Sequence, residues 1–95
     1  MFHIYILQCR DGSFYTGQTD ELENRLAQHE QAYFKDCYTA QRLPVKLVYQ
    51  ANFESREQAL TIEKQIKGWN RKKKQALIDN DWQEIMRLSK RERKT

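Results

Sequence analysis

Two runs of aromatic and aliphatic residues open the chain and predict a β-hairpin. Residues 2–8 and 13–19 have the composition of strands, and the Arg10-Asp11-Gly12 segment between them is typical of a turn. Apolar side chains occupy both alternating sets of positions, which indicates a sheet covered by helices on both faces. Ile4, Ile6 and Phe14 belong to one set, and Tyr5, Leu7 and Tyr15 belong to the other.

The length of the hairpin loop decides which of these side chains share a face. A two-residue loop at Asp11 and Gly12 pairs residues whose numbers sum to 23 and puts Tyr5 and Tyr15 on opposite faces. A three-residue loop, with Gly12 in the left-handed region as in a G1 bulge, makes the sum 22 and puts both tyrosines on one face. If the two tyrosines share a site, the three-residue loop is required.

Apolar residues at helical spacing follow the hairpin. Residues 21–34 predict a first helix that begins with a capping box of Asp20 and Glu23, because an acidic cap followed three residues later by Glu is typical of a helix start. Its repeating side is formed by Leu22, Leu26, His29 and Tyr33.

A third strand and three further helices are predicted in the rest of the chain. The strand covers residues 45–53, and the second helix begins at a cap of Ser55 with Gln58 and ends near Gly68. Asn70 and Asp81 are predicted to cap two more helices, the last extending from Trp82 to about Leu88. The pattern predicts a small α/β (α+β) fold in which helices flank a three-stranded antiparallel sheet. Both Trp69 and Trp82 lie in helical apolar patterns, which favours core packing over base stacking.

The 95 residues, 39% of them hydrophobic, fit one domain. We expect this domain to cover residues 1–89 and residues 90–95 to form a basic, frayed tail. Neither a membrane-spanning nor a targeting segment is predicted. Cys9 and Cys37 lack the CxxC spacing of a zinc or redox site, so free thiols in a reducing, cytoplasmic compartment are expected, with a disulfide as the alternative. A monomer without a small-molecule cofactor is the favoured state.

Charge is distributed unevenly along the chain. Residues 1–63 hold six Lys or Arg against nine Asp or Glu, whereas residues 64–95 hold eleven against four, so the last third carries a net charge of +7. Such a block suits binding to a polyanion, although a solvated helical surface would have the same composition.

Several polar and aromatic residues stand in a specific order along this framework. His3-Ile4-Tyr5 lies in the first strand and Tyr15-Thr16-Gly17 in the second, with the two tyrosines ten residues apart. Arg25 and His29 share one side of the first helix, and Glu63 lies on the core-facing side of the second. In these residues, and in the Lys64 to Arg71 segment, residues 3–82 resemble the GIY-YIG nuclease superfamily, and within it the small standalone endonuclease group.

The resemblance implies a GIY-YIG nuclease fold and metal-dependent hydrolysis of DNA phosphodiester bonds, in DNA repair or processing. It assigns catalytic roles to Tyr5, Tyr15, Arg25, His29 and Glu63. Tyr5 would orient or deprotonate the attacking water, with Tyr15 beside it, and His29 would support the phosphate or the nucleophile. Arg25 would clamp the phosphate, and Glu63 would be the single protein ligand of a Mg²⁺ or Mn²⁺ ion. DNA contacts are expected from Lys64, Lys67, Asn70, Arg71, Lys72, Lys73 and Lys74.

Each of these residues also has a structural interpretation. Glu63 and Arg25 could form a buried ion pair, and the tyrosines and His29 could be core residues. Asn70 is explained equally well as a helix cap. Two other functions therefore stay open: a nucleic-acid-binding domain without turnover, and an interaction domain whose basic end binds an acidic protein. The DNA structure or sequence preferred, and the choice between DNA and RNA, are not indicated.

Overall fold

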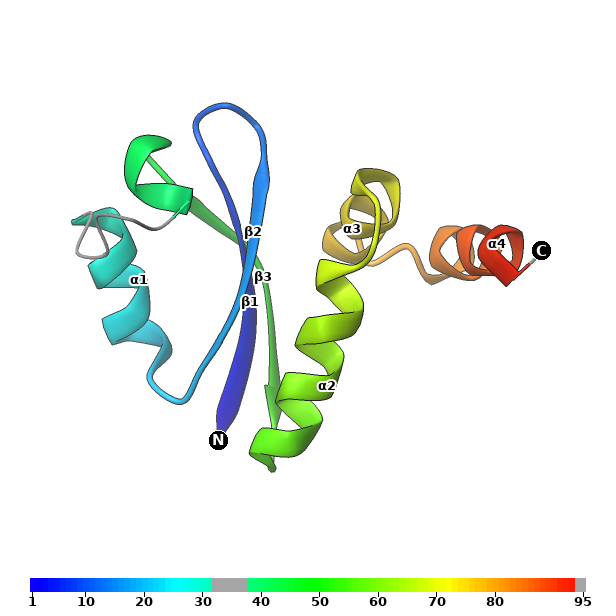
Figure 1. Cartoon of the computed structure of the whole chain (residues 1–95), viewed down its shortest axis with the longest axis horizontal. Coiled ribbons are helices and arrows are strands. Elements are labelled where there is room, and N and C mark those ends of the chain that lie inside the picture. The colour runs from blue at the N-terminus through cyan, green and yellow to red at the C-terminus, as the bar shows by residue number, and fades with distance from the viewer. Residues whose placement is uncertain (32–37, 94–95) are drawn as a thin grey trace.

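A three-stranded antiparallel sheet forms the centre of the protein. The computed structural model describes residues 1–31 and 38–93. Its strands are β1 (Phe2–Gln8), β2 (Phe14–Thr19) and β3 (Lys46–Phe53), in the order β2-β1-β3 (Figure 1). The predicted α+β fold class is confirmed, and β2 is an edge strand.

The β1–β2 hairpin has the three-residue loop that a shared tyrosine site requires. The amide of Gly12 donates to the carbonyl of Cys9 (2.9 Å), and the amide of Cys9 donates to the carbonyl of Ser13 (2.8 Å). Gly12 has a φ of 86°, a conformation that glycine adopts without steric cost. Tyr5 therefore pairs with Gly17 and Leu7 with Tyr15, so the predicted register is confirmed and both tyrosines lie on one face.

The first helix differs from its prediction. Helix α1 covers Leu22–Glu30, its N-cap is Glu21, and no side chain caps it, so the predicted capping box of Asp20 and Glu23 is wrong. The hydroxyl of Thr19 accepts the amide of Glu21 (3.1 Å), and this turn moves the helix start one residue along the chain. Gln31 is the C-cap, and the rest of the predicted helix, residues 32–34, lies outside the described residues.

The caps of the next two helices are as predicted. In α2 (Arg56–Lys67) the hydroxyl of Ser55 accepts the amide of Gln58 (3.0 Å), and Gly68 is the C-cap. In α3 (Arg71–Ile78) the side chain of Asn70 accepts the amide of Lys73 (2.9 Å). A short 3₁₀ helix, η1 (Tyr38–Gln41), precedes β3 and was not predicted.

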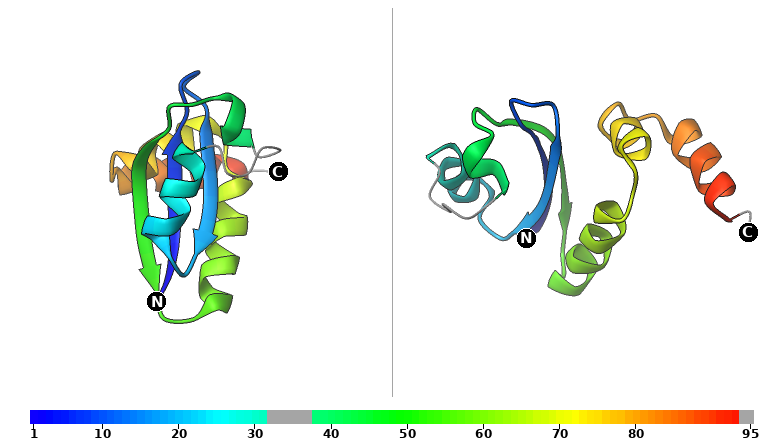
Figure 2. Two further views of the ribbon diagram at one scale, coloured as in Figure 1. Left: turned by 90° about the vertical axis from the view of Figure 1, so that its left-hand side faces the viewer. Right: turned by 45° about the horizontal axis from the view of Figure 1, so that its top comes forward.

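Helices cover both faces of the sheet, as its two apolar faces predicted. Figures 1 and 2 show α1 on one side of the strands and α2 on the other. On the α2 side, the fully buried Ile4 and Ile6 join a core cluster that includes Ala59, Ile66 and Leu77. On the α1 side, Tyr5 and Leu7 are buried, and Tyr5 contacts His29 of α1. Cys9 is buried on the sheet side of the hairpin turn.

The last helix lies at the end of the molecule away from the sheet. Helix α4 (Trp82–Arg93) extends beyond its predicted end at Leu88, and Asp81 accepts the amide of Glu84 (3.1 Å) as predicted for a cap. Ile85 and Leu88 are buried, whereas Trp82 is 55% exposed, so the prediction that Trp82 packs in the core is wrong. The packed face of α4 is the one that carries Ile85 and Leu88, and the indole lies on the neighbouring face.

Across the part of the chain that the structure describes, the helices are too short or too polar to span a membrane.

Candidate active site

The phenol of Tyr5 lies at the centre of the site because the hairpin register places Gly17 opposite it. A methyl group built on Gly17 would overlap the Tyr5 hydroxyl and the adjoining ring carbon. The absence of a side chain on the edge strand thus gives the Tyr5 ring its position. The glycine of the Tyr15-Thr16-Gly17 motif therefore has a steric reason to be glycine.

A buried chain of hydrogen bonds joins β1, α1 and η1. The hydroxyl of Tyr5 is 3.0 Å from Nε2 of His29, and Nδ1 of His29 is 2.8 Å from the hydroxyl of Thr39. Each of the three residues is only 1% exposed. Sequence reasoning missed Thr39, because no periodic pattern marks residues 38–41 and only the fold brings this hydroxyl to His29.

The surroundings of His29 favour the neutral form of its imidazole. Burial lowers the pKa of His29 below its usual value, and the positive charge of Arg25 lowers this pKa further. A neutral imidazole has one nitrogen that donates and one that accepts. If Nδ1–H donates to Thr39, then Nε2 is the acceptor for the Tyr5 hydroxyl.

Tyr15 and Arg25 lie next to the hydrogen-bonded residues Tyr5 and His29. The ring of Tyr15 is 5.1 Å from the ring of His29 and 6.3 Å from that of Tyr5, measured between centroids. Tyr15 and Arg25 are half-buried, so both are nearer to solvent than Tyr5 and His29. Four of the five predicted catalytic residues are therefore together on the α1 side of the sheet.

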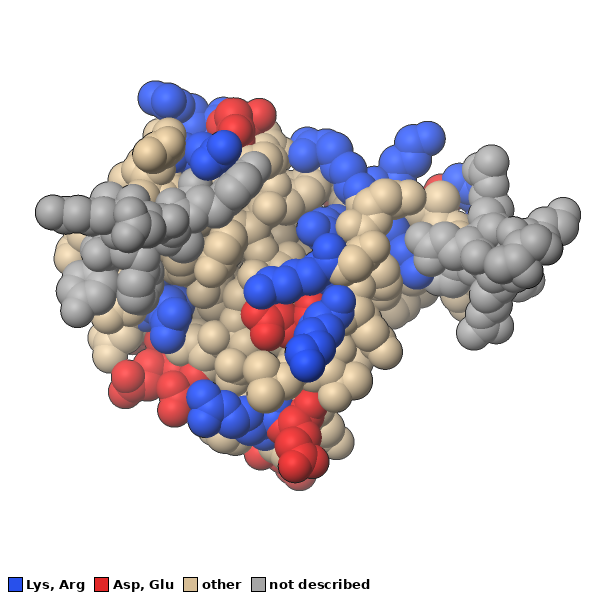
Figure 3. Space-filling model, in the orientation of Figure 1, with Lys and Arg blue, Asp and Glu red and all other residues tan. Residues whose placement is uncertain are grey.

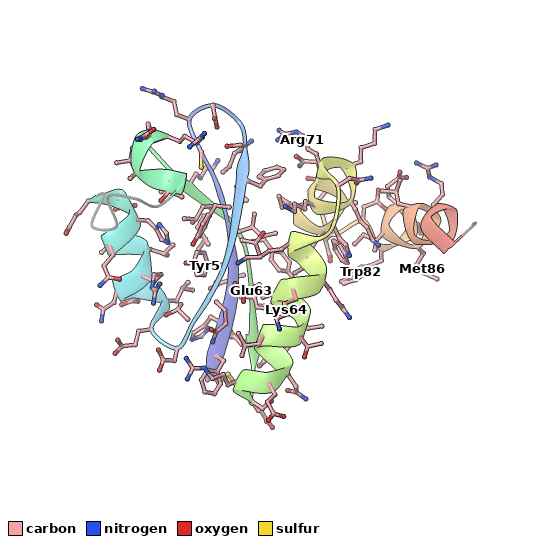
Figure 4. All side chains as sticks on the ribbon, in the orientation of Figure 1. Tyr5, Glu63, Lys64, Arg71, Trp82 and Met86 are labelled. Atoms are coloured by element: carbon pink, nitrogen blue, oxygen red, sulfur yellow. The ribbon has the colours of Figure 1, made fainter. Side chains whose placement is uncertain are left out.

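Glu63 lies on the other side of the edge strand. In Figure 4, Tyr5 is on the α1 side of β2 and Glu63 is on the α2 side. The Glu63 side chain is 14% exposed, and its carboxylate pairs with Lys67 one turn later (3.1 Å). The alternative of a structural ion pair with Arg25 is not what the structure has, since Lys67 provides the countercharge.

The residues around Glu63 fit a hard divalent cation held by one carboxylate. Among the residues that the structure describes, no three His, Cys, Asp or Glu side chains group together as a metal cage. A carboxylate oxygen is a ligand that Mg²⁺ and Mn²⁺ accept, with waters and a substrate phosphate completing the coordination. Because Lys67 is 54% exposed, its ammonium can leave Glu63 without breaking a packed contact.

The residues predicted to contact nucleic acid have different environments. Lys64, Lys67, Arg71 and Lys72 are exposed, and Figure 3 shows Lys and Arg side chains over α2 and α3 around a central acidic patch. Lys73, by contrast, is 5% exposed and its ammonium lies over the ring of Trp69, 4.5 Å from the centroid. This position gives Lys73 a packing contact instead of a free surface charge. The half-buried Trp69 packs against the core cluster.

Three more of these residues have contacts that bear on their roles. Arg71 donates to the carbonyl of Gly12 (2.7 Å) and lies over the Phe14 ring, which ties α3 to the hairpin loop. Asn70 caps α3. Burial lowers the pKa of Lys74, and the nearby ammonium of Lys67 lowers it further, so these two cations repel each other.

Known proteins resemble this chain in sequence. Residues 1–76 match the family model described as the GIY-YIG catalytic domain. A UPF0213 protein of Staphylococcus saprophyticus is 43% identical over 76 residues, which cover 80% of this chain and 92% of that protein. A UPF0213 protein of Halobacterium salinarum is 38% identical over 78 residues, covering 82% of this chain and 100% of that protein.

A solved structure of another UPF0213 protein has a similar fold. The solution NMR structure of a UPF0213 protein from Bacillus halodurans aligns with a TM-score of 0.55 at 40% identity and covers 83% of this chain and 84% of its own. Sequence and fold thus give the same relatives.

The contact between Tyr5 and Gly17 predicts the effect of a single methyl group. Gly17→Ala is expected to lower the free energy of unfolding by about 1–3 kcal/mol, the usual cost of overpacking a tight core. Gly68→Ala is the matched control, because the nearest atom to its added methyl group is 3.5 Å away. Urea unfolding of both variants measures the difference, and a Gly17→Ala protein as stable as the control would contradict the packing argument.

The lowered pKa of His29 predicts a pH dependence of stability. The unfolded chain, in which the pKa of His29 is near 6.5, binds the proton before the folded chain does. The stabilisation is therefore present above about pH 6.5 and is lost as the pH falls below it. Between pH 7.5 and 5.5 the wild type should lose more unfolding free energy than His29→Gln. Equal losses in the two proteins, measured by urea unfolding, would rule out a neutral buried imidazole.

Proposed function

Because this chain belongs to the GIY-YIG family of catalytic domains, we propose that it is a metal-dependent endonuclease that hydrolyses DNA phosphodiester bonds. A role in DNA repair or processing would suit this activity. The observation that carries the proposal is the buried hydrogen bond between the Tyr5 hydroxyl and neutral His29. This pair can take part in catalysis as well as in packing, because the neutral imidazole can accept the proton of the phenol.

Water activation is the step that this pair supports. Free tyrosine has a pKa near 10, so its phenol is a poor base at neutral pH unless its own proton can leave. As a water oxygen attacks the phosphorus, the water proton would pass to the oxygen of Tyr5, and the Tyr5 proton would pass to Nε2 of His29. The bond from phosphorus to the leaving oxygen breaks, and that oxygen takes a proton from solvent. Water would reach the buried Tyr5 from the half-buried Tyr15 side.

Arg25 would couple this proton transfer to substrate binding. Its charge lowers the pKa of His29 when no phosphate is present. A phosphate clamped by the guanidinium would offset that charge and make His29 a stronger base. The base would therefore become effective only when the substrate is in place.

Glu63 would act from the other side of β2. Its carboxylate would hold one Mg²⁺ or Mn²⁺ ion, which when bound supplies positive charge to the phosphate and the leaving oxygen. Lys67 would give up its ion pair with Glu63 and turn to the DNA backbone, together with Lys64, Arg71, Lys72 and Lys74. We place the protein in the cytoplasm as a monomer, with DNA as its partner.

A second candidate is a DNA-binding domain of the same fold without turnover. The observation that favours it is that Tyr5 and His29 are each only 1% exposed, which limits access of water to them. Incubation of the protein with duplex, flap, branched and single-stranded DNA in Mg²⁺ or in chelator separates the two candidates. Cleavage that requires the metal supports the nuclease, and binding without cleavage supports the second candidate.

The proposed metal-binding role of Glu63 predicts that a substitution there removes cleavage but not DNA binding. Glu63→Gln is expected to abolish Mg²⁺-dependent cleavage while DNA affinity stays unchanged, since the lost charge acts on the ion. The Lys67 partner is exposed, so the unfolding free energy should change by less than about 1 kcal/mol. Glu57→Gln, an exposed carboxylate of the same helix, is the control. A Glu63→Gln protein that cleaves at the wild-type rate, or that loses several kcal/mol of stability, would refute the metal role.

Thr39 is predicted to position His29 through its hydroxyl. Thr39→Val keeps the shape and removes the acceptor for Nδ1–H, so the share of His29 molecules with an accepting Nε2 should fall. Cleavage should drop by about 10²-fold, the lower end of what general base catalysis contributes. Thr39→Ser, which keeps the hydroxyl, should have the wild-type tautomer of His29 and the wild-type cleavage rate. Nitrogen-15 NMR of the imidazole reports the tautomer, and an unchanged tautomer in Thr39→Val would exclude this positioning role.

A further inference from the structure

Two large apolar side chains are exposed side by side on α4. Trp82 and Met86 are 55% and 60% exposed, and they lie one helical turn apart. Ile85 and Leu88 hold the adjacent face of the helix against the protein. This helix lies beyond residues 1–76, which match the family domain, so the exposed pair is not explained by the active site.

The indole of Trp82 is fixed in its exposed position. Its Nε1–H donates to the side-chain oxygen of Asn80 (2.8 Å). Asn80 has a φ of 58°, a left-handed conformation that asparagine tolerates better than most residues. The amide of Asn80 donates to Leu77 (3.1 Å) and that of Asp81 to Ala76 (2.8 Å), so the turn between α3 and α4 is itself held by hydrogen bonds. A ring held in this way loses little entropy when a ligand stacks on it.

Charge decides which ligand fits this surface. Residues 87–95 contain five Lys or Arg and one acidic residue, within a last third of net charge +7. Two copies of so basic a segment repel each other, and two exposed apolar side chains are far too few for a stable protein interface. A polyanion with flat apolar groups meets both conditions, and nucleic acid with unpaired bases is such a ligand.

The surface also follows on from the candidate active site. In Figure 4, Glu63 and Lys64 lie next to the sheet, and Trp82 and then Met86 lie farther along toward the C-terminal end. Lys67 and Lys74 repel each other, and a phosphate bound near both would relieve that repulsion. A DNA strand leaving the metal side of the site would meet these cations before the indole.

We propose that Trp82 and Met86 form a stacking platform for an unpaired base of single-stranded DNA. If the protein is the nuclease proposed above, on which this step rests, its substrate is DNA with a single-stranded segment beside the phosphate that is cut. Trp82 supplies the aromatic face, and the polarizable thioether of Met86 supports the edge of the base.

Binding in chelator tests the platform without any need for cleavage. The probes are a single-stranded 12-mer of thymidylate and a blunt duplex of equal length, each carrying a fluorescent label for anisotropy. Stacking is worth about 1–3 kcal/mol per base, so Trp82→Ala should weaken single-strand binding by about five- to 150-fold and leave blunt-duplex binding unchanged. Trp82→Phe should retain most of the affinity. Leu60→Ala, which removes an exposed apolar side chain from α2, is the control and should bind both probes like the wild type.

The fluorescence of Trp82 gives a second readout. In a Trp69→Phe background, where Trp82 is the remaining tryptophan, the single strand should quench the emission and the blunt duplex should not. Unchanged single-strand affinity in Trp82→Ala, or an equal loss for both probes, would overturn the platform. Self-association of the wild type that Trp82→Ala abolishes would assign this face to a second copy and also overturn it. A specific single-strand loss in a protein that cleaves no DNA in Mg²⁺ would support the platform and refute the nuclease.

Discussion

The pairing of Tyr5 with Gly17 is the constraint from which the rest of the site follows. The left-handed Gly12 closes a three-residue loop and fixes the hairpin register. A shift by one residue would send the Tyr15 ring to the α2 face and put a side chain beneath Tyr5. In the observed register the phenol lies over bare backbone and reaches Nε2 of His29 at 3.0 Å. A turn at the tip of the sheet thus determines a hydrogen bond between the sheet and α1.

The edge position of β2 is what would let groups on two faces of the sheet serve one site, as the proposed function requires. The sheet order β2-β1-β3 leaves the outer side of β2 without a strand partner among the described residues. Tyr5 and Glu63 lie on either side of this strand, which carries no side chain at Gly17 (Figure 4). In the proposed mechanism the phosphate would lie at the open edge of β2, with proton transfer on the α1 side and the metal on the α2 side. Neither α1 nor α2 alone carries all of the groups that this mechanism would use.

The sequence predicted most helices and strands, because their signals lie within a few residues of one another. It did not predict features that depend on contacts between segments far apart in the sequence. The loop register and the caps at Ser55, Asn70 and Asp81 were predictable because each depends on neighbours in the sequence. The capping box at Asp20 failed because the chain turns at Thr19, whose hydroxyl accepts the amide of Glu21, and the helix begins at Leu22 with Glu21 as its N-cap. Thr39 had no local signal. Lys73 did have one, since it lies four residues after Trp69 and three before Ala76, on the packed side of its helix. Its place within a basic run obscured that spacing.

In the proposed mechanism Tyr5 and His29 act as one unit, and a double-mutant cycle on DNA cleavage tests this coupling most directly. Tyr5→Phe, His29→Gln and the double variant are compared with the wild type in Mg²⁺ at saturating DNA. Residues that act together are strongly non-additive, so either single change should cost nearly as much rate as both changes together. Rate losses that multiply in the double variant would show that the two side chains act independently and would contradict the account.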